Sequence, residues 1–199
     1  MDAVWSFLIT AFALAGSPGP NTLSVAAVGA SYGRSRGIEY MAGLNIGVAA
    51  VILIVGTGVA GAVLAVPGIA PVITALAIAY FLYLAWRIAT APPLAEIKST
   101  GATAGPRWHA GVVLSLANPK AYAAMGALFS GHVFVPGILL VDGLWIAALA
   151  IFVNCIVNLC WLMAGAGMAR LLSDPRASRT VNVVFALLLL ASVALVAVG

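Results

Sequence analysis

The chain has 199 residues, of which 64% are hydrophobic and only 7% are charged, whereas soluble domains contain roughly 45–50% and 25%. Its net charge of +4 comes from basic residues scattered between apolar runs, which is unlike the clustered basic patch of a nucleic-acid-binding protein. These values exclude a soluble globular domain. They predict an all-α polytopic membrane protein, because a membrane helix needs about 20 mostly apolar residues.

The apolar runs predict six transmembrane helices, which cover residues 4–31, 38–64, 70–90, 108–131, 136–168 and 180–198. Basic residues accumulate in cytoplasmic loops. Here they follow the odd-numbered helices, near 34–36, 92–107 and 170–179. We therefore expect these three loops in the cytoplasm and both termini outside it, in a multi-pass protein of the cell inner membrane.

The first predicted helix is interrupted by Ser17-Pro18-Gly19-Pro20-Asn21. A proline lacks the amide hydrogen and obstructs the carbonyl four residues earlier, so carbonyls near 13–16 should lose their helical partners. The segment that starts at Asn21 should present free amides at a half-helix N-terminus, where an anion is favoured. The break predicts a binding site for a substrate carboxylate; a simple kink is the competing interpretation.

Glycines recur at helical spacing after this break, at positions 29, 33, 37, 43 and 47. In lipid, small residues let helix backbones approach closely. This pattern favours tight packing within one bundle, with dimer contacts or sliding surfaces as the alternatives.

The polar connection 92–107 divides the chain into halves 1–91 and 108–199, each with three predicted helices. Because three is odd, the second half must cross the membrane in the opposite orientation. A single membrane domain over 1–199, built as two inverted three-helix repeats, follows if the halves share a fold. The broken first helix of each half supports this prediction.

The matching break in the second half is Asn118-Pro119-Lys120, 101 residues after the first. Broken helices in corresponding positions of two halves are a sequence pointer to a transporter's substrate site. Lys120 should lie near mid-bilayer, where a lysine must face a cavity or a partner. It is either a receptor for the substrate carboxylate or one half of a structural ion pair with Asp142.

Asp142 lies deep in the apolar sequence, six residues into the fifth predicted helix. An acidic residue inside a membrane marks an ion or proton pathway by default. We therefore predict proton coupling through Asp142. Asn45, Asn154 and Asn158 also fall on predicted helices, and hydrogen bonds between helices explain them better than ligand contact does.

These motifs resemble those of the lysine exporter (LysE/RhtB) family of amino-acid efflux proteins. The resemblance rests on Gly16-Ser17-Pro18-Gly19-Pro20-Asn21, on Gly33-Arg34-Ser35-Arg36-Gly37 followed by Gly43 and Gly47, and on Asn118-Pro119-Lys120-Ala121. It implies an inner-membrane exporter that exchanges amino acids for protons and acts as a homo-oligomer, with a homodimer expected. It implies substrate-binding roles for Pro18, Gly19, Pro20, Asn21, Asn118, Pro119 and Lys120, but none for Asp142.

The few acidic residues within the predicted helices disfavour a dicationic substrate, so neutral amino acids such as homoserine or threonine fit better. We expect no cofactor, metal site or catalytic residue. The alternative functions are a metal-cation exporter of the wider superfamily, which would need several converging ligands, and a membrane enzyme or non-transporting membrane protein. Neither a protease Ser and His pair nor a redox cysteine pair can be recognised.

Overall fold

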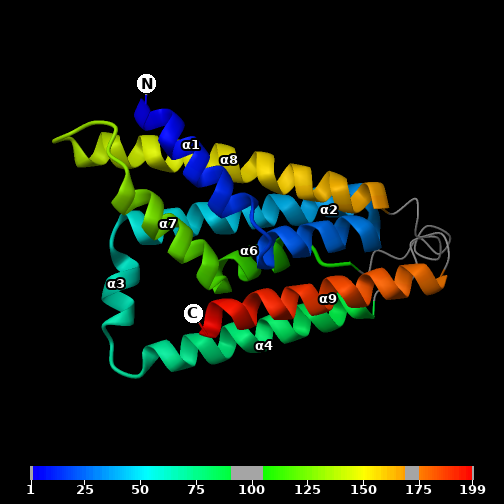
Figure 1. Cartoon of the computed structure of the whole chain (residues 1–199). Coiled ribbons are helices and arrows are strands. Elements are labelled where there is room, and N and C mark those ends of the chain that lie inside the picture. Colours follow the sequence, from blue (N-terminus) through cyan, green and yellow to red (C-terminus); the bar gives the residue numbers. More distant parts are fainter. Residues whose placement is uncertain (1, 91–104, 169–174, 199) are drawn as a thin grey trace.

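The computed structural model describes residues 2–90, 105–168 and 175–198, and within these ranges the chain is helical with no strand. The helices are α1 (Asp2–Gly16), α2 (Pro20–Gly56), α3 (Val59–Leu64), α4 (Ile69–Ala89), α6 (Trp108–Ala117), α7 (Pro119–Gly131), α8 (Leu139–Met168) and α9 (Pro175–Val198). They form an elongated bundle whose long helices run along one common axis (Figure 1). Most of the predicted linker, residues 92–104, lies outside the described residues.

Helix α2 is not straight, because Gly33 interrupts it with a positive φ of 82° and a ψ of 174°. A Cβ atom on Gly37 would lie 3.4 Å from the Cα of Gly29, although eight residues of straight helix rise about 12 Å. The two arms of α2 therefore fold back on each other at this glycine (Figure 1). The turn at Gly33 lies between the first two predicted helices, which cover 4–31 and 38–64.

Close backbone contacts hold the bundle together. A Cβ on Gly43 would lie 1.8 Å from the carbonyl oxygen of Trp108, and one on Gly165 would lie 2.0 Å from that of Ala26. The return arm of α2 thus lies against α6, and its first arm lies against α8. This confirms that glycines allow tight packing within one bundle. Helices α4 and α9 form a separate pair alongside (Figure 1).

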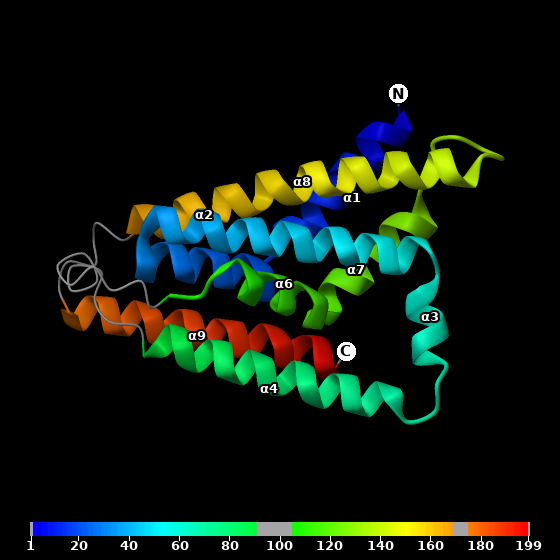
Figure 2. The ribbon, with the colours of Figure 1, turned by 180° about the vertical axis from the view of Figure 1, so that it is seen from behind.

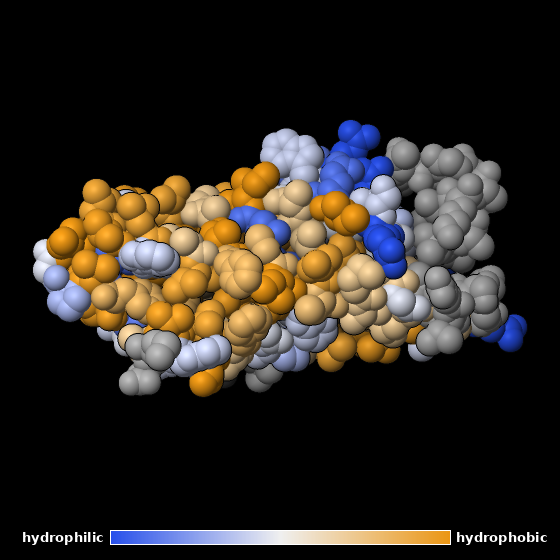
Figure 3. All heavy atoms as spheres, turned by 90° about the horizontal axis from the view of Figure 1, so that it is seen from above, coloured by the Kyte–Doolittle hydropathy of each residue, from blue (hydrophilic) through white to orange (hydrophobic). Residues whose placement is uncertain are grey.

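Large apolar side chains cover much of the outside of the bundle. Leu76 is 68% exposed, Leu187 60% and Trp86 61%, and the face drawn in Figure 3 is mostly hydrophobic. By length and composition, α2, residues 71–89 of α4 and α8 can each cross a membrane, and α6 with α7 forms a fourth candidate bent by 64°. The chain is therefore a multi-pass membrane protein.

The described basic residues other than Lys120 gather at one end of the bundle. Tyr32, beside the turn of α2, donates a hydrogen bond to the carbonyl of Arg87 in the last turn of α4 (3.2 Å). Arg107 immediately precedes α6, and α9 begins at the same end (Figure 2). Arg36 forms an ion pair with Glu39 there. Both described chain ends, at α1 and α9, point towards the opposite side (Figure 1).

Candidate functional site: the meeting point of two broken helices

The first break separates α1 from α2 and frees the carbonyls of Gly16, Ser17 and Pro18. Lys120 donates through Nζ to the carbonyl oxygens of Ser17 (2.6 Å) and Pro18 (3.2 Å). Trp161 Nε1 donates to Gly16 O (3.3 Å). All three groups are satisfied by residues from the second half of the chain.

The prediction that carbonyls over 13–16 lose their helical partners is wrong for Ala13. It is right for Leu14, because Pro18 has no amide hydrogen to donate, and the Ser17 hydroxyl takes its place. The amide of Ser17 still donates to Ala13 O (3.2 Å), and its hydroxyl donates to Leu14 O (3.0 Å). Helix α1 nevertheless continues to Gly16. The Ser17 hydroxyl donates to the carbonyl that Pro18 cannot reach with an amide hydrogen, and this closes the last turn.

The start of α2 carries the second part of the site. Gly19 is the N-cap residue, and its amide donates to Thr22 Oγ1 (2.9 Å). Pro20, at the first helical position, has no amide hydrogen. The amides of Asn21 and Thr22 belong to the first turn and have no acceptor within the helix. The N-terminus of α2 therefore offers donors and a positive dipole end to an anion.

The second break separates α6 from α7 and is capped differently. Asn118 is the N-cap residue of α7, and its Oδ1 accepts a hydrogen bond from the amide of Lys120 (3.1 Å). The amide of Ala121 donates to Asn118 O (3.0 Å). The first turn of α7 therefore has its donors satisfied by its own cap, with Pro119 at the first helical position.

The two breaks are joined by a buried hydrogen-bond chain. Asn118 Nδ2 donates to Asn21 Oδ1 (2.9 Å), Asn21 Nδ2 donates to Ser115 Oγ (3.1 Å), and Ser115 Oγ donates to Leu44 O (3.0 Å). Asn21 is 8% exposed, Asn118 3% and Ser115 0%. Each polar group is satisfied, which fixes the relative position of both breaks.

Gly19 leaves room for the side chain of Lys120. A Cβ atom on Gly19 would lie 2.8 Å from Lys120 Cδ and 2.9 Å from Nζ. The extended backbone of Gly19, with a φ of −174°, is open to any residue, so the constraint is one of space. Glycine lets the lysine stem lie across the break and bring its ammonium to the freed carbonyls.

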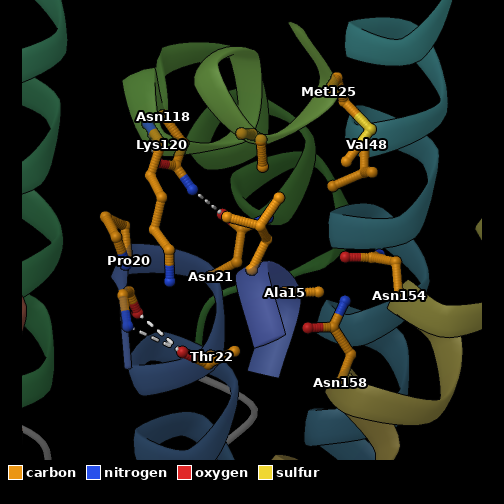
Figure 4. A pocket seen from close by; sticks show the side chains of 14 residues that line it. Ala15, Pro20, Asn21, Thr22, Val48, Asn118, Lys120, Met125, Asn154 and Asn158 are labelled. Carbon is orange, nitrogen blue, oxygen red and sulfur yellow. Dashed lines mark hydrogen bonds between the residues drawn. The ribbon is translucent and has the colours of Figure 1, made fainter. Parts of the chain in front are cut away.

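A cavity lies between these elements, with about 40 Å³ of space for the centres of water-sized molecules. That space holds roughly three waters at about 10–15 Å³ each. Its walls come from α1, α2, α7 and α8, with Lys120 and Pro20 on one side and Asn154 and Asn158 on the other (Figure 4). Lys120 is the lone ionisable side chain among the described residues that line it.

The structure brings most of the predicted site residues to this cavity. Gly19, Pro20, Asn21, Asn118, Lys120, Asn154 and Asn158 line it. Ser17 and Pro18 take part through their carbonyls, and Pro119 through the start of α7. Asn45 accepts hydrogen bonds from Asn154 Nδ2 (2.9 Å) and Asn158 Nδ2 (2.8 Å), so the predicted bonds between helices are present.

Asp142 is not part of the cavity lining. It sits in the first turn of α8, and its Oδ1 accepts hydrogen bonds from the backbone amides of Phe134 and Val135, the latter at 2.9 Å. Asn154 follows twelve residues later, about 18 Å along the helix. Within the described ranges Lys120 and Asp142 form no ion pair. The ion-pair alternative is therefore not realised in this conformation.

Ser115 and Trp161 were not predicted as site residues. Ser115 lies three residues before Asn118, close to one helical turn, which places both on one side of the chain. This spacing could have identified Ser115 as a neighbour of the second break. Trp161 could not have been found, because its contact with Gly16 joins residues 145 positions apart.

In the described residues there is no group of three or more His, Cys, Asp and Glu side chains placed to hold a metal ion. The polar groups at the cavity are amides, backbone groups and one ammonium. This set matches the recognition of a small polar anion or zwitterion.

Comparison with known proteins agrees with the geometry. The chain is 29% identical to the cysteine/O-acetylserine efflux protein of Escherichia coli O139:H28, over 96% of the chain and 93% of that protein. The proteins of the same name from Escherichia coli K12 and Shigella flexneri are also 29% identical, over 95% of the chain and 93% of each. No solved structure matches significantly. The LysE type translocator model matches residues 12–198, and the chain therefore belongs to this family.

Proposed function

We propose that this protein exports small neutral amino acids across the inner membrane. The observation that carries the proposal is the junction of the two breaks. The first residues of α2 and Lys120 line one cavity, and Asn21 and Asn118 hold the two breaks together. A carboxylate between the α2 N-terminus and Lys120 would meet donors from both halves of the chain.

Lys120 can take this role without leaving the break. An ammonium has three donor hydrogens, and two of them are directed at Ser17 and Pro18. The third remains for a substrate oxygen. Because Lys120 also bridges the two halves, binding and the relative position of the halves are coupled.

The lining favours a substrate without a second positive charge. No carboxylate is among the described lining residues, so a lysine or arginine side chain would enter without a counter-charge, at a high desolvation cost. Neutral compounds of the size of cysteine, O-acetylserine or homoserine fit this chemistry. The named substrates of the similar efflux proteins belong to this class.

We further propose six membrane-crossing segments arranged as two inverted three-helix repeats. The first segment comprises α1 and the first arm of α2, and α6 with α7 is its counterpart. The second segments are the return arm of α2 and α8, and each packs against the broken helix of the other half. The third segments, α4 and α9, pair with each other.

The gathering of basic residues at one end supports an orientation with that end in the cytoplasm. Both termini would then lie outside it. Lys98 and Arg170, which belong to the same prediction, lie outside the described residues. The exposed apolar surface would face lipid, and part of it would be covered in a homodimer.

Export requires the cavity to widen, because the space for roughly three waters is smaller than an amino acid. Separation of α1 and α2 from α7 and α8 would enlarge it and expose it to one side at a time. Proteoliposome counterflow against a panel of amino acids tests the proposal. Uptake of O-acetylserine driven by internal substrate supports it, and no exchange of any amino acid would overturn it.

Proton exchange through Asp142 is the second part of the proposal. Asparagine keeps the Oδ1 acceptor for Phe134 and Val135, so Asp142→Asn removes the charge while preserving the local fold. We expect this variant to keep counterflow but to lose acceleration by an imposed pH gradient. An unchanged response to the gradient would limit Asp142 to holding the loop before α8.

A further inference from the structure

One polar atom at the cavity wall has no role in the junction described above. Asn158 Oδ1 is buried and has no hydrogen-bond partner among the described residues, and the Asn158 residue is 1% exposed. A buried acceptor without a donor is destabilising. Its presence at a candidate binding site calls for a donor that arrives with the ligand.

The orientation of Asn158 follows from its neighbour on α2. Asn45 Oδ1 accepts the Nδ2 groups of both Asn154 and Asn158. Because the amide nitrogen of Asn158 is committed to Asn45, its oxygen is turned away from that bond. In Figure 4 this oxygen points towards Ala15, which lines the cavity opposite Lys120.

We infer that Asn158 Oδ1 receives the α-ammonium group of a zwitterionic substrate whose carboxylate is held by Lys120 and the start of α2. The inference rests on the proposed function and adds a requirement for a free amino group. An ammonium has only donors, so it can satisfy the acceptor. A neutral amide oxygen accepts from it without introducing a buried charge.

This arrangement gives the cavity two chemically different ends. Hydrogen-bond donors lie at the end formed by Gly19, Asn21 and Lys120, and the acceptor Asn158 Oδ1 lies on α8 at the other end. An amino acid has the matching polarity in its own backbone, whatever its side chain. The proposed site therefore selects the α-amino-acid group and leaves the side chain to the apolar wall of Val48, Ala124 and Met125.

Two isomeric ligands test the inference directly. O-acetyl-L-serine and N-acetyl-L-serine contain the same atoms, but only the first has an ammonium group. Binding of each is measured on the purified full chain in mildly acidic buffer, with transport in proteoliposomes alongside. We expect the wild type to prefer O-acetylserine by about 10- to 100-fold, the range for a hydrogen bond to a charged group.

Two substitutions assign the preference to one atom. Asn158→Leu, which is nearly isosteric, should bring the ratio of the two affinities close to one. Asn158→Asp should keep or raise it, because a carboxylate attracts the ammonium. The ratio is insensitive to a loss of folded protein, which lowers both signals together. Thr57→Val, outside the cavity, is the polar-to-apolar control and should leave the ratio unchanged.

The outcomes separate the inference from the proposed function. If Asn158→Leu leaves the preference for O-acetylserine intact, a water molecule satisfies Asn158 and the ammonium assignment is wrong. If Asn158→Asp lowers the ratio instead of keeping or raising it, the side-chain oxygen at this position does not face the ammonium, and the assignment is again overturned. If the wild type transports no amino acid, the proposed function itself falls.

Discussion

The two broken helices are built from similar residues but present different chemistry to the cavity. At the first break, Gly19 lacks a side chain and Pro20 lacks an amide hydrogen, so the first turn of α2 has no side-chain cap for its amides. At the second, Asn118 caps the first turn of α7 through its own side chain. One break therefore offers backbone donors, and the other offers the charge of Lys120.

This difference shows how each break depends on the other. The carbonyls freed by the first break would be costly in a membrane if they were unsatisfied. They are satisfied by Lys120, which the second break places beside them. An isolated half would lack these donors. The junction is therefore a structural requirement as well as the proposed binding site.

The largest expected effect comes from removing the charge. Lys120→Met keeps the apolar stem but loses the ammonium, and truncating one partner of a buried charge pair costs about 2 kcal/mol or more. We expect counterflow affinity for O-acetylserine to fall by at least about 30-fold. Arg179→Met, at the exposed start of α9, is the matched control and should transport normally. Equal behaviour of both variants would remove Lys120 from the site.

A smaller effect is expected from crowding the lysine. Gly19→Ala adds a Cβ that would lie 2.8 Å from Lys120 Cδ, so the side chain must move while the extended backbone stays. We expect about a 10-fold loss of affinity, equal to about 1.4 kcal/mol, with little change in unfolding temperature. Gly126→Ala, on α7 with nothing near its Cβ, should transport normally. A Gly19→Ala variant with wild-type affinity would show that Lys120 need not lie over the break.

The smallest effect measures the bond between the breaks. A double-mutant cycle of Asn21→Ala and Asn118→Ala should give a coupling of about 1 kcal/mol in substrate binding. The loss of the α7 cap in Asn118→Ala cancels in the cycle, because it occurs in both the single and the double variant. Additivity to within about 0.3 kcal/mol would mean that the two asparagines act independently.

Sequence reasoning located the breaks but not all their partners. Pro18, Pro20 and Pro119 determine where the helices must stop, because proline acts on its own backbone. The 101-residue offset and the loop charges indicated that the breaks would meet, and Asn21 and Asn118 do meet. Local rules suffice for the positions of the breaks, and the two-halves pattern is needed for their contact.

The contacts of Lys120 and Asp142 could not be predicted from the sequence. A lysine side chain is long and flexible, so its sequence position did not reveal that it binds the carbonyls of Ser17 and Pro18. The alternative pairing of Lys120 with Asp142 rested on their opposite charges, yet Asp142 accepts hydrogen bonds from amides only seven and eight residues away. The backbone amides of this nearby loop bind the Asp142 carboxylate in place of Lys120, and the charges in the sequence did not reveal them.

In the proposed site, donors from both breaks hold a substrate carboxylate. The most direct test of this arrangement is the ratio of affinities for O-acetylserine and for its carboxamide, measured on the wild type and on Lys120→Met. We expect a strong preference for the acid in the wild type. In the variant a residual two- to fivefold preference should remain, about the contribution of a helix N-terminus. The same preference in both proteins would show that Lys120 does not hold the substrate carboxylate.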